Sequence, residues 1–490
     1  MTQLRRVGPC LVLALAIYLL TGLVGTGRYP RVWVDEGWVA EVGWTLAHEG
    51  HLGNPSHGSL HQYDQRVYWM PPLYFLALVP LDGIASDPLT AGRMLSLFIG
   101  GLELVVLFWM ALRLGGGRTQ LAWVLWVALA FTLDPTLWKA HRSIRFEPLT
   151  GLFILSAVGS AAFAPRRLAW LGGAVFSALA TLTHPTGILA VPASLGTWLY
   201  RRPEKRWRSL LAATGVFVAL LLPYLAYLAQ DRGSGFSNLL GQNAPHVTGR
   251  SEPVIWQWFR EWTRYRNYFA WPKLVVPCAL WVVTLVLAVR HRAPRWLVWT
   301  LAILAGGFAC LPNKTELYLT LMAPFLYLLA GWTGERLSHR KAVWAGAFLW
   351  LAVLAAADLA LIHRNRDCRY RDWVAPLLQS VPEHASVAGT FVTWFAFHDH
   401  PYYELHRRRA GDLADTRPQV VIWGDAHTMD PIFSRLRAEL GPFLAAHADT
   451  LAQSASGCYG NAAVLRPHWE ELDPRVAAGW ERFGKGDPAS

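Results

Sequence analysis

Residues 7–24, VGPCLVLALAIYLLTGLV, follow Arg5 and Arg6 and contain no charged side chain. A run of this length is long enough to cross a bilayer as a helix, which takes roughly 20 predominantly apolar residues. A cleaved signal peptide has a shorter apolar core and ends in a small-x-small cleavage site, whereas this run continues as GTGRYP. We therefore predict an uncleaved first transmembrane helix.

The composition of the whole chain extends this pattern. Of the 490 residues, 53% are apolar and only 16% are charged, whereas soluble domains are about 25% charged. This balance excludes a disordered chain, a coiled coil and a typical nucleic-acid-binding protein. Further apolar runs lie near 93–112, 119–138, 148–164, 168–183, 186–200, 209–229, 273–290, 296–311, 315–332 and 342–361. We predict an all-α polytopic membrane protein with about eleven transmembrane helices.

The net charge of +12 is concentrated in alternate short loops. Such loops face the cytoplasm in polytopic proteins, so we predict a cytoplasmic N-terminus. The loops predicted to lie on the opposite face of the membrane are then 27–92, 139–147, 184–185, 230–272 and 312–314, together with the tail. The basic loop residues are Arg113, Arg118, Arg166, Arg167, Arg201, Arg202, Lys205, Arg206, Arg208, Arg290, Arg292, Arg295, Arg336, Arg340 and Lys341.

The short apolar segment 70–81, MPPLYFLALVPL, tests this topology. If it crossed the membrane, every later loop would change sides and the basic loops would lie outside. We therefore predict a juxtamembrane or re-entrant segment on the outer face.

The tail has a different pattern from residue 363 onward. Helical patterns at 373–378 and 432–444 alternate with the strand-like runs ASVAGTF, PQVVIWG and NAAVL, which indicates a small soluble α/β domain. We therefore predict a membrane domain, 1–362, and an extracytoplasmic domain, 363–490. The tail contains Cys368 and Cys458, and the sequence leaves open whether they pair.

Two adjacent carboxylates, Asp35 and Glu36, follow the first helix by about ten residues. Carboxylates beside a membrane helix are costly to desolvate, which favours a functional interpretation. The alternative is that Asp35 is an N-cap, because a helix-like stretch, GWVAEVGWTLAHEG, follows it.

A second polar stretch, WKAHRSIRFEP (138–148), follows the third apolar run and is predicted to lie on the same face. Lys139, Arg142 and Arg145 are suited to hold a phosphate. The alternative is that Glu147 complements a helix dipole and the cations lie at the membrane interface. Carboxylates and cations on one face together indicate group transfer from a lipid phosphate.

These motifs resemble a family. The acidic pair, the PPLY segment, AGRMLSLFIGGLELVVLFWMALRLGG, HRSIRFEPLTGLFILSA and LTHPTGILAVP occur in that order. They resemble the GT-C membrane glycosyltransferases, specifically the protein O-mannosyltransferases and aminoarabinose transferases, over about residues 7–200. The resemblance implies a GT-C fold and inverting transfer of a sugar from a polyprenyl-phosphate donor to a hydroxyl acceptor on the periplasmic side.

The resemblance also implies residue roles. Asp35 corresponds to the general base, Glu36 to its neighbour in the acidic pair, and Glu147 to a second acidic residue near the donor. Arg142 and Arg145 correspond to phosphate-binding positions.

Two positions depart from the family pattern. His184 stands where relatives often carry Lys, and Met70 stands where they carry Lys or His. Arg66 or the 139–145 stretch is expected to compensate for the cation missing at Met70.

The predicted partners are a polyprenyl-phosphate-linked sugar, an acceptor protein, lipid or polysaccharide, and membrane lipids, with no nucleic acid. The Ala- and Arg-rich composition favours a bacterial inner membrane and undecaprenyl phosphate as carrier. Two alternatives stay open, a transporter or flippase of lipid-linked sugars and a non-catalytic relative.

No cofactor is indicated, and dependence on a divalent metal is left open. The first loop carries His48, His51, His57 and His61 near Asp64, but their spacing matches no metal-site template. The aromatic and basic stretch 256–266 indicates an interfacial belt or the lining of a sugar or prenyl site.

Overall fold

The computed structural model describes residues 2–57, 63–68, 70–115, 121–201, 207–230, 235–236, 239, 254–268, 275–311, 315–405, 409–424 and 431–480. Contacts divide the chain into two compact units. The first, called the helical unit here, comprises Met1–Val24, Tyr68–Tyr74 and Met94–His363. The second, called the mixed unit, comprises Gly25–Val67, Phe75–Arg93 and Arg364–Ser490. Most of the first predicted outer loop therefore groups with the tail.

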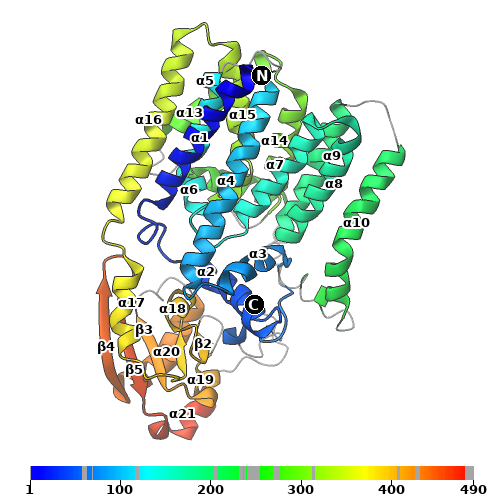
Figure 1. Ribbon diagram of the computed structural model, residues 1–490. Helices are drawn as coiled ribbons and strands as arrows, with labels where there is room; N and C mark the ends of the chain where they lie inside the picture. The colour runs from blue at the N-terminus through cyan, green and yellow to red at the C-terminus, as the bar shows by residue number, and fades with distance from the viewer. Residues whose placement is uncertain are drawn as a thin grey trace. The chain divides into compact units, whose positions relative to one another are not determined.

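Every predicted apolar run contains a helix, and the long helices of the helical unit run side by side (Figure 1). Two short 3-10 segments, η3 (Pro185–Leu189) and η4 (Glu316–Leu321), precede α9 and α15. The helices are α1 (Thr2–Leu23), α4 (Pro88–Leu114), α5 (Leu121–Thr132), α6 (Pro135–Ala140), α7 (Glu147–Phe163), α8 (Arg166–Thr183), α9 (Ala190–Arg201), α10 (Trp207–Ala229), α12 (Val254–Tyr268), α13 (Val275–Arg290), α14 (Arg295–Ala309), α15 (Ala323–Arg336) and α16 (Lys341–Arg364).

The run predicted as one helix over 119–138 is broken between α5 and α6. Asp134 caps α6, because its Oδ1 accepts hydrogen bonds from the backbone N–H groups of Thr136 (2.7 Å) and Leu137 (3.1 Å). Pro135 occupies the first helical position, where its missing N–H costs nothing. The hydroxyl of Tyr327 donates to Asp134 Oδ2 at 2.6 Å, which fixes the start of α6 against α15.

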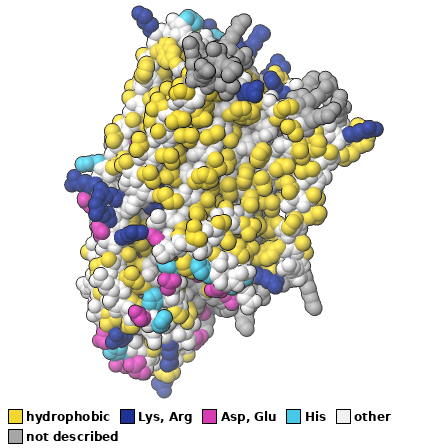
Figure 2. Space-filling model, viewed as in Figure 1, with side chains coloured by type: hydrophobic (Ala, Val, Ile, Leu, Met, Phe, Trp, Pro, Cys, Tyr) yellow, Lys and Arg dark blue, Asp and Glu magenta, His cyan; other side chains and the backbone are white. Residues whose placement is uncertain are grey.

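The surface of the helical unit is that of a membrane protein. Large apolar side chains such as Leu20, Phe348 and Val289 are exposed, and hydrophobic side chains cover much of the visible face (Figure 2). Among the described residues, α4, α10 and α16 are long and apolar enough to cross a bilayer, and several shorter apolar helices accompany them. The chain is therefore an integral membrane protein, and the number of spans stays a prediction.

Basic side chains gather at the end of the helical unit that carries the N-terminus (Figures 1 and 2). The described basic residues predicted to be cytoplasmic include Arg113, Arg201, Arg290 and Arg340, all of which are exposed. Others, namely Arg118, Arg202, Lys205 and Arg206, lie outside the described residues.

The mixed unit contains a five-stranded sheet of order β2-β1-β3-β5-β4. Strand β1 pairs in parallel with β2 and β3, whereas β5 is antiparallel to both β3 and β4. The three predicted strands correspond to β1, β3 and β5. The strands are β1 (Val387–Gly389), β2 (Tyr402–Glu404), β3 (Val420–Gly424), β4 (Ala448–Ser456) and β5 (Gly460–Pro467).

Helices from both ends of the chain complete the mixed unit. Helix α2 packs against α18, and a disulfide joins Cys368 to Cys458 across 90 residues, with the two Cα atoms 5.4 Å apart. That this unit is soluble and extracytoplasmic stays a prediction. Its helices are α2 (Val34–Glu49), α17 (Tyr370–Gln379), α18 (Phe391–Phe397), α19 (Ala410–Thr416), α20 (Pro431–Ala446) and α21 (Pro474–Gly479).

The short helix α3 (Leu73–Asp82), predicted to lie at the membrane surface, ends in a buried carboxyl group. Asp82 is 1% exposed, and neither of its carboxyl oxygens has a hydrogen-bond partner within the described ranges. It packs against α2 at Gly43, where a Cβ atom would lie 2.8 Å from Asp82 Oδ2. Burial raises the pKa of Asp82 to about 7.

This raised pKa predicts a pH-dependent stability. The folded state holds the Asp82 proton more tightly than the unfolded chain, whose carboxyl titrates near pH 4. The stabilisation of the folded state by this proton is therefore fully present below about pH 4. It is lost as the pH rises through about 7, and it amounts to roughly 1.4 kcal/mol per unit of pKa shift. We expect Asp82→Asn to raise the Tm at pH 8 and to change it little at pH 4. An equal effect at both pH values would contradict this account.

Candidate active site

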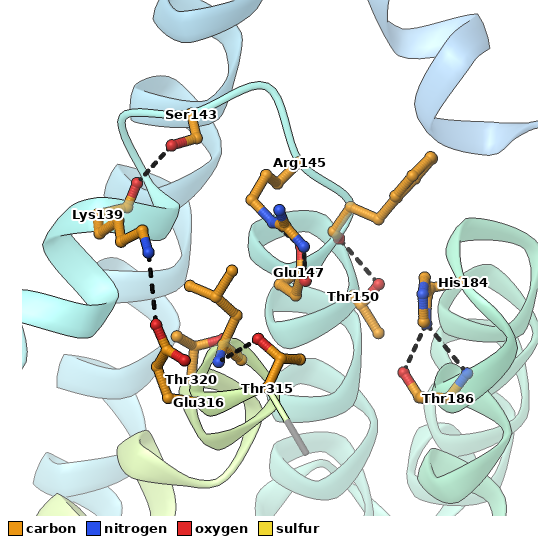
Figure 3. A network of polar contacts seen from close by, with 12 residues as sticks. Lys139, Ser143, Arg145, Glu147, Thr150, His184, Thr186, Thr315, Glu316 and Thr320 are labelled. Atoms are coloured by element: carbon orange, nitrogen blue, oxygen red, sulfur yellow. Dashed lines mark hydrogen bonds and ion pairs between the residues drawn. The ribbon is translucent and has the colours of Figure 1, made fainter. Parts of the chain in front are cut away.

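The end of α6 and the segment that joins it to α7 carry the predicted donor-binding cations, of which Figure 3 shows Lys139 and Arg145. Lys139 lies near the end of α6, and its Nζ is 3.4 Å from Oε1 of Glu316, the first residue of η4. The hydroxyl of Ser143 donates to the Lys139 carbonyl at 2.9 Å. Lys139 is about one-third exposed, so its charge can also act on a ligand beside it.

Arg145 and Glu147 form a bidentate ion pair at the start of α7 (Figure 3). Arg145 Nε and Nη2 donate to the two carboxylate oxygens of Glu147 at 3.0 and 2.8 Å. Glu147 is buried at the positive end of the helix dipole, and the Arg145 side chain is 18% exposed. The Arg145 backbone N–H donates to the Tyr74 hydroxyl at 3.1 Å. The pair is thus fixed from several sides while part of the Arg145 side chain stays accessible.

Arg142 lies between α6 and α7, and its buried side chain contacts the residue that follows α1. Its Nη2 donates to the Val24 carbonyl at 2.5 Å. Its guanidinium carbon lies 4.1 Å from the centroid of the Trp138 ring, in a cation–π contact. These contacts tie the 139–147 segment to the first helix, and a role for Arg142 in phosphate binding stays a prediction.

His184 lies at the junction of α8 and η3 (Figure 3). Its Nδ1 accepts a hydrogen bond from the Thr186 backbone N–H at 3.2 Å, so a neutral ring carries its proton on Nε2. The ring centroid is 5.8 Å from those of Phe146 and Tyr318. His184 therefore contacts both the start of α7 and the η4 segment, which places it in the same part of the helical unit as the predicted cations.

The acidic pair lies in the mixed unit, in the first turn of α2. The N-cap of this helix is Trp33, so the interpretation of Asp35 as the N-cap is wrong. The Glu36 side chain instead takes part in capping the helix, because its Oε2 accepts a hydrogen bond from the backbone N–H of the N-cap residue Trp33 at 3.0 Å. Asp35 is half-buried.

Glu36 is almost completely buried and forms a fork with Arg93. Arg93 Nε and Nη2 donate to Glu36 Oε1 and Oε2 at 3.0 and 2.8 Å, and Nη1 donates to the Thr26 carbonyl at 2.9 Å. Arg93 was not among the predicted site residues. The available signal was a charged residue near the start of a long apolar helix, which requires a partner.

The other predicted residues contribute less to these clusters. Arg66 lies half-buried in the mixed unit. His57 is buried, and its Nδ1 is 2.7 Å from Asn54 Oδ1, while His61 lies outside the described residues. Within the part of the chain that the structure describes, no group of three or more His, Cys, Asp or Glu side chains is placed to hold a metal ion.

Helix α12 lies in the predicted outer stretch and turns its aromatic side chains outward. Trp256, Trp258 and Trp262 are more than half exposed, whereas Arg264 is completely buried. Arg264 donates to Glu261 and to the backbone carbonyls of Thr315 and Phe308. This arrangement favours the interfacial-belt interpretation of the three tryptophans.

The buried Glu36–Arg93 pair predicts a large stability effect. Arg93→Met leaves a carboxylate buried without its partner, so we expect a loss of about 3–5 kcal/mol. Thermal unfolding of the detergent-solubilised protein measures this effect. The double variant Arg93→Met/Glu36→Gln should recover a large part of the loss, because Gln is neutral and still accepts from Trp33 N–H. A single variant as stable as the wild type would show that the pair is dispensable.

No protein-family model and no curated protein matches this chain. Its structure is similar to the crystal structure of ArnT from Cupriavidus metallidurans bound to undecaprenyl phosphate, with a TM-score of 0.65 and 16% identity over 93% of this chain and 97% of that chain. The apo state of the same protein matches with a TM-score of 0.64 at the same identity and coverage.

A weaker match is the cryo-EM structure of the arabinosyltransferase EmbB from Mycobacterium smegmatis. It covers 68% of this chain and 31% of that chain, at 18% identity and a TM-score of 0.41. The similarity to ArnT extends over nearly the full length of both chains. It confirms that the chain has the fold of ArnT.

Proposed function

We propose that this protein is a membrane glycosyltransferase that moves a sugar from a polyprenyl-phosphate donor to a hydroxyl group of an acceptor. The observation that carries the proposal is the Arg145–Glu147 fork, with Lys139 in the same segment and the His184 ring beside Phe146, in a fold like that of an ArnT bound to undecaprenyl phosphate. A lipid-linked donor also explains why these cations are set among membrane helices.

The donor phosphate would be bound by cations of the 139–147 segment. The guanidinium of Arg145, which Glu147 engages through Nε and Nη2, would supply a positive charge to the phosphate, and the partly exposed ammonium of Lys139 adds a second positive charge. Arg142 and His184 would also contribute, and Arg66 is a further candidate. Glu147 would act near the donor by holding Arg145 in place.

In the proposed reaction Asp35 is the general base. It takes the proton of the acceptor hydroxyl while that oxygen attacks the anomeric carbon. The bond between that carbon and the phosphate oxygen breaks, its electron pair leaves with the polyprenyl phosphate, and the configuration inverts. Glu36 is engaged by Arg93 through both oxygens, which favours Asp35 as the proton acceptor of the acidic pair.

We place the reaction on the extracytoplasmic face of a bacterial inner membrane, with undecaprenyl phosphate as the carrier. The Cys368–Cys458 disulfide supports this side for the mixed unit, because disulfides persist in oxidising compartments. The acceptor hydroxyl belongs to a protein, a lipid or a polysaccharide.

Replacing Asp35 tests the base. Asp35→Asn keeps the shape of the side chain and removes its basicity, so we expect turnover to fall by roughly a hundredfold or more. Donor affinity and Tm should stay close to the wild-type values. Asp367→Asn, which changes an exposed carboxylate of the same unit, is the matched control and should retain full turnover. Wild-type turnover in Asp35→Asn would exclude this residue as the base.

Replacing Arg145 tests the donor site. Arg145→Lys keeps the positive charge opposite Glu147 but removes the fork, so we expect undecaprenyl phosphate to bind about tenfold more weakly, equivalent to about 1.4 kcal/mol. Arg113→Lys, an exposed residue on the predicted cytoplasmic side, is the control. Unchanged binding in Arg145→Lys would indicate a purely structural arginine.

A further inference from the structure

The segment that carries Asp35 is hydrogen-bonded to the tail of the chain. The Val32 backbone N–H donates to the Tyr459 hydroxyl at 3.1 Å. Arg31 donates from Nη1 to the Cys458 carbonyl at 2.9 Å and from Nε to Asn365 Oδ1 at 3.2 Å. Residues more than 300 positions apart thus meet within the mixed unit, three or four residues before Asp35.

Tyr459 is itself fixed. Its ring is 5% exposed and stacks on Trp373, with ring centroids 5.0 Å apart, and it meets Tyr370 edge-on at 5.8 Å. It occupies the turn between β4 and β5, next to Cys458, which is bonded to Cys368. A buried ring held by two aromatic neighbours and a disulfide is a rigid acceptor for the Val32 N–H group.

The residues after Asp35 are held as well. Arg93 donates two hydrogen bonds to Glu36. Gly37 packs directly against the Phe391 carbonyl oxygen, where a Cβ atom would not fit without movement of the backbone. Trp38 stacks on Phe391 with ring centroids 6.4 Å apart. Asp35 therefore lies between two anchored stretches of backbone, and the Tyr459 contact anchors the backbone to the tail three residues before it.

We propose that Tyr459, in the turn secured by the Cys368–Cys458 disulfide, is a positioning residue for Asp35. This inference rests on the proposed function, in which Asp35 is the base. A base must lie within hydrogen-bond reach of the proton it removes, and a displacement of about 1 Å can lower a rate by about a hundredfold. Loss of the Tyr459 hydroxyl frees the backbone at Val32 and lets the first turn of α2 shift.

The test compares Tyr459→Phe with Tyr402→Phe in the full-length protein in detergent. Tyr402 is also a buried tyrosine of the mixed unit, but its hydroxyl bonds to Thr390 and Thr393. Hydrolysis of a panel of undecaprenyl-phosphate-linked hexoses and pentoses gives the rate, undecaprenyl phosphate binding gives the donor affinity, and thermal unfolding gives the Tm. We expect the Tm of the two variants to fall by similar amounts.

Only Tyr459→Phe should lower the rate, by about tenfold or more, with donor affinity within about twofold of wild type. The double variant Cys368→Ser/Cys458→Ser should change the rate in the same direction. Should Tyr459→Phe fail to fold, Arg31→Gln removes the neighbouring contacts from an exposed side chain and takes its place.

The variant Asp35→Asn distinguishes failure of the positioning role of Tyr459 from failure of the assignment of Asp35 as the base. If it abolishes hydrolysis while Tyr459→Phe retains the wild-type rate, or while Tyr402→Phe loses as much as Tyr459→Phe, the positioning role is overturned and the base assignment stands. If Asp35→Asn hydrolyses the donor at the wild-type rate, the base assignment fails and the positioning role fails with it.

Discussion

A carboxylate buried beside apolar helices must be neutralised, and the two carboxylates central to this structure each meet that requirement through an arginine. Glu36 is held by Arg93 and Glu147 by Arg145, in both cases through two hydrogen bonds of 2.8 to 3.0 Å. An unpaired charge in such a place costs several kcal/mol. Each pair also fixes the backbone at the start of a helix, α2 in one unit and α7 in the other. The candidate catalytic and donor-binding residues belong to these two helix starts and the segments leading into them.

The two pairs differ in what they leave available for chemistry. The Glu36–Arg93 pair is closed to solvent, so it stabilises α2 and leaves Asp35, its half-buried neighbour, as the candidate base. The Arg145 side chain of the Arg145–Glu147 pair is partly exposed, which suits an anion that arrives and leaves. A glycosyl transfer needs both a rigid base and an accessible phosphate-binding group, and the proposed function assigns these roles to Asp35 and Arg145.

Much of the helical unit could be predicted from the sequence, because apolar runs of membrane length depend on local composition alone. The break at Asp134-Pro135 was missed, although an Asp followed by Pro is a typical helix start. In the tail, β2 is only three residues long and β4 is rich in polar residues, so neither formed a strand-like run like the one that indicated β5. Candidate residues near α7 were found because their motif is continuous in the sequence.

Long-range partners could not be predicted in this way. Arg93 lies 57 residues from Glu36, and Tyr459 lies 427 residues from Val32, so no local pattern relates them. The pairing of Cys368 with Cys458 was likewise left open by the sequence, and the structure joins them. These contacts bring the first outer segment and the tail into one unit, around the residue proposed as the base.

The most direct measurement is mass spectrometry of polyprenyl-phosphate sugars incubated with the purified protein in the absence of acceptor. The account predicts that one donor stabilises the protein and is slowly hydrolysed to polyprenyl phosphate, and that Asp35→Asn abolishes the hydrolysis but retains the stabilisation. If no donor of the panel binds or is hydrolysed, the glycosyltransferase account is contradicted, and Met70, at the position where relatives carry a cation, becomes the first residue to re-examine.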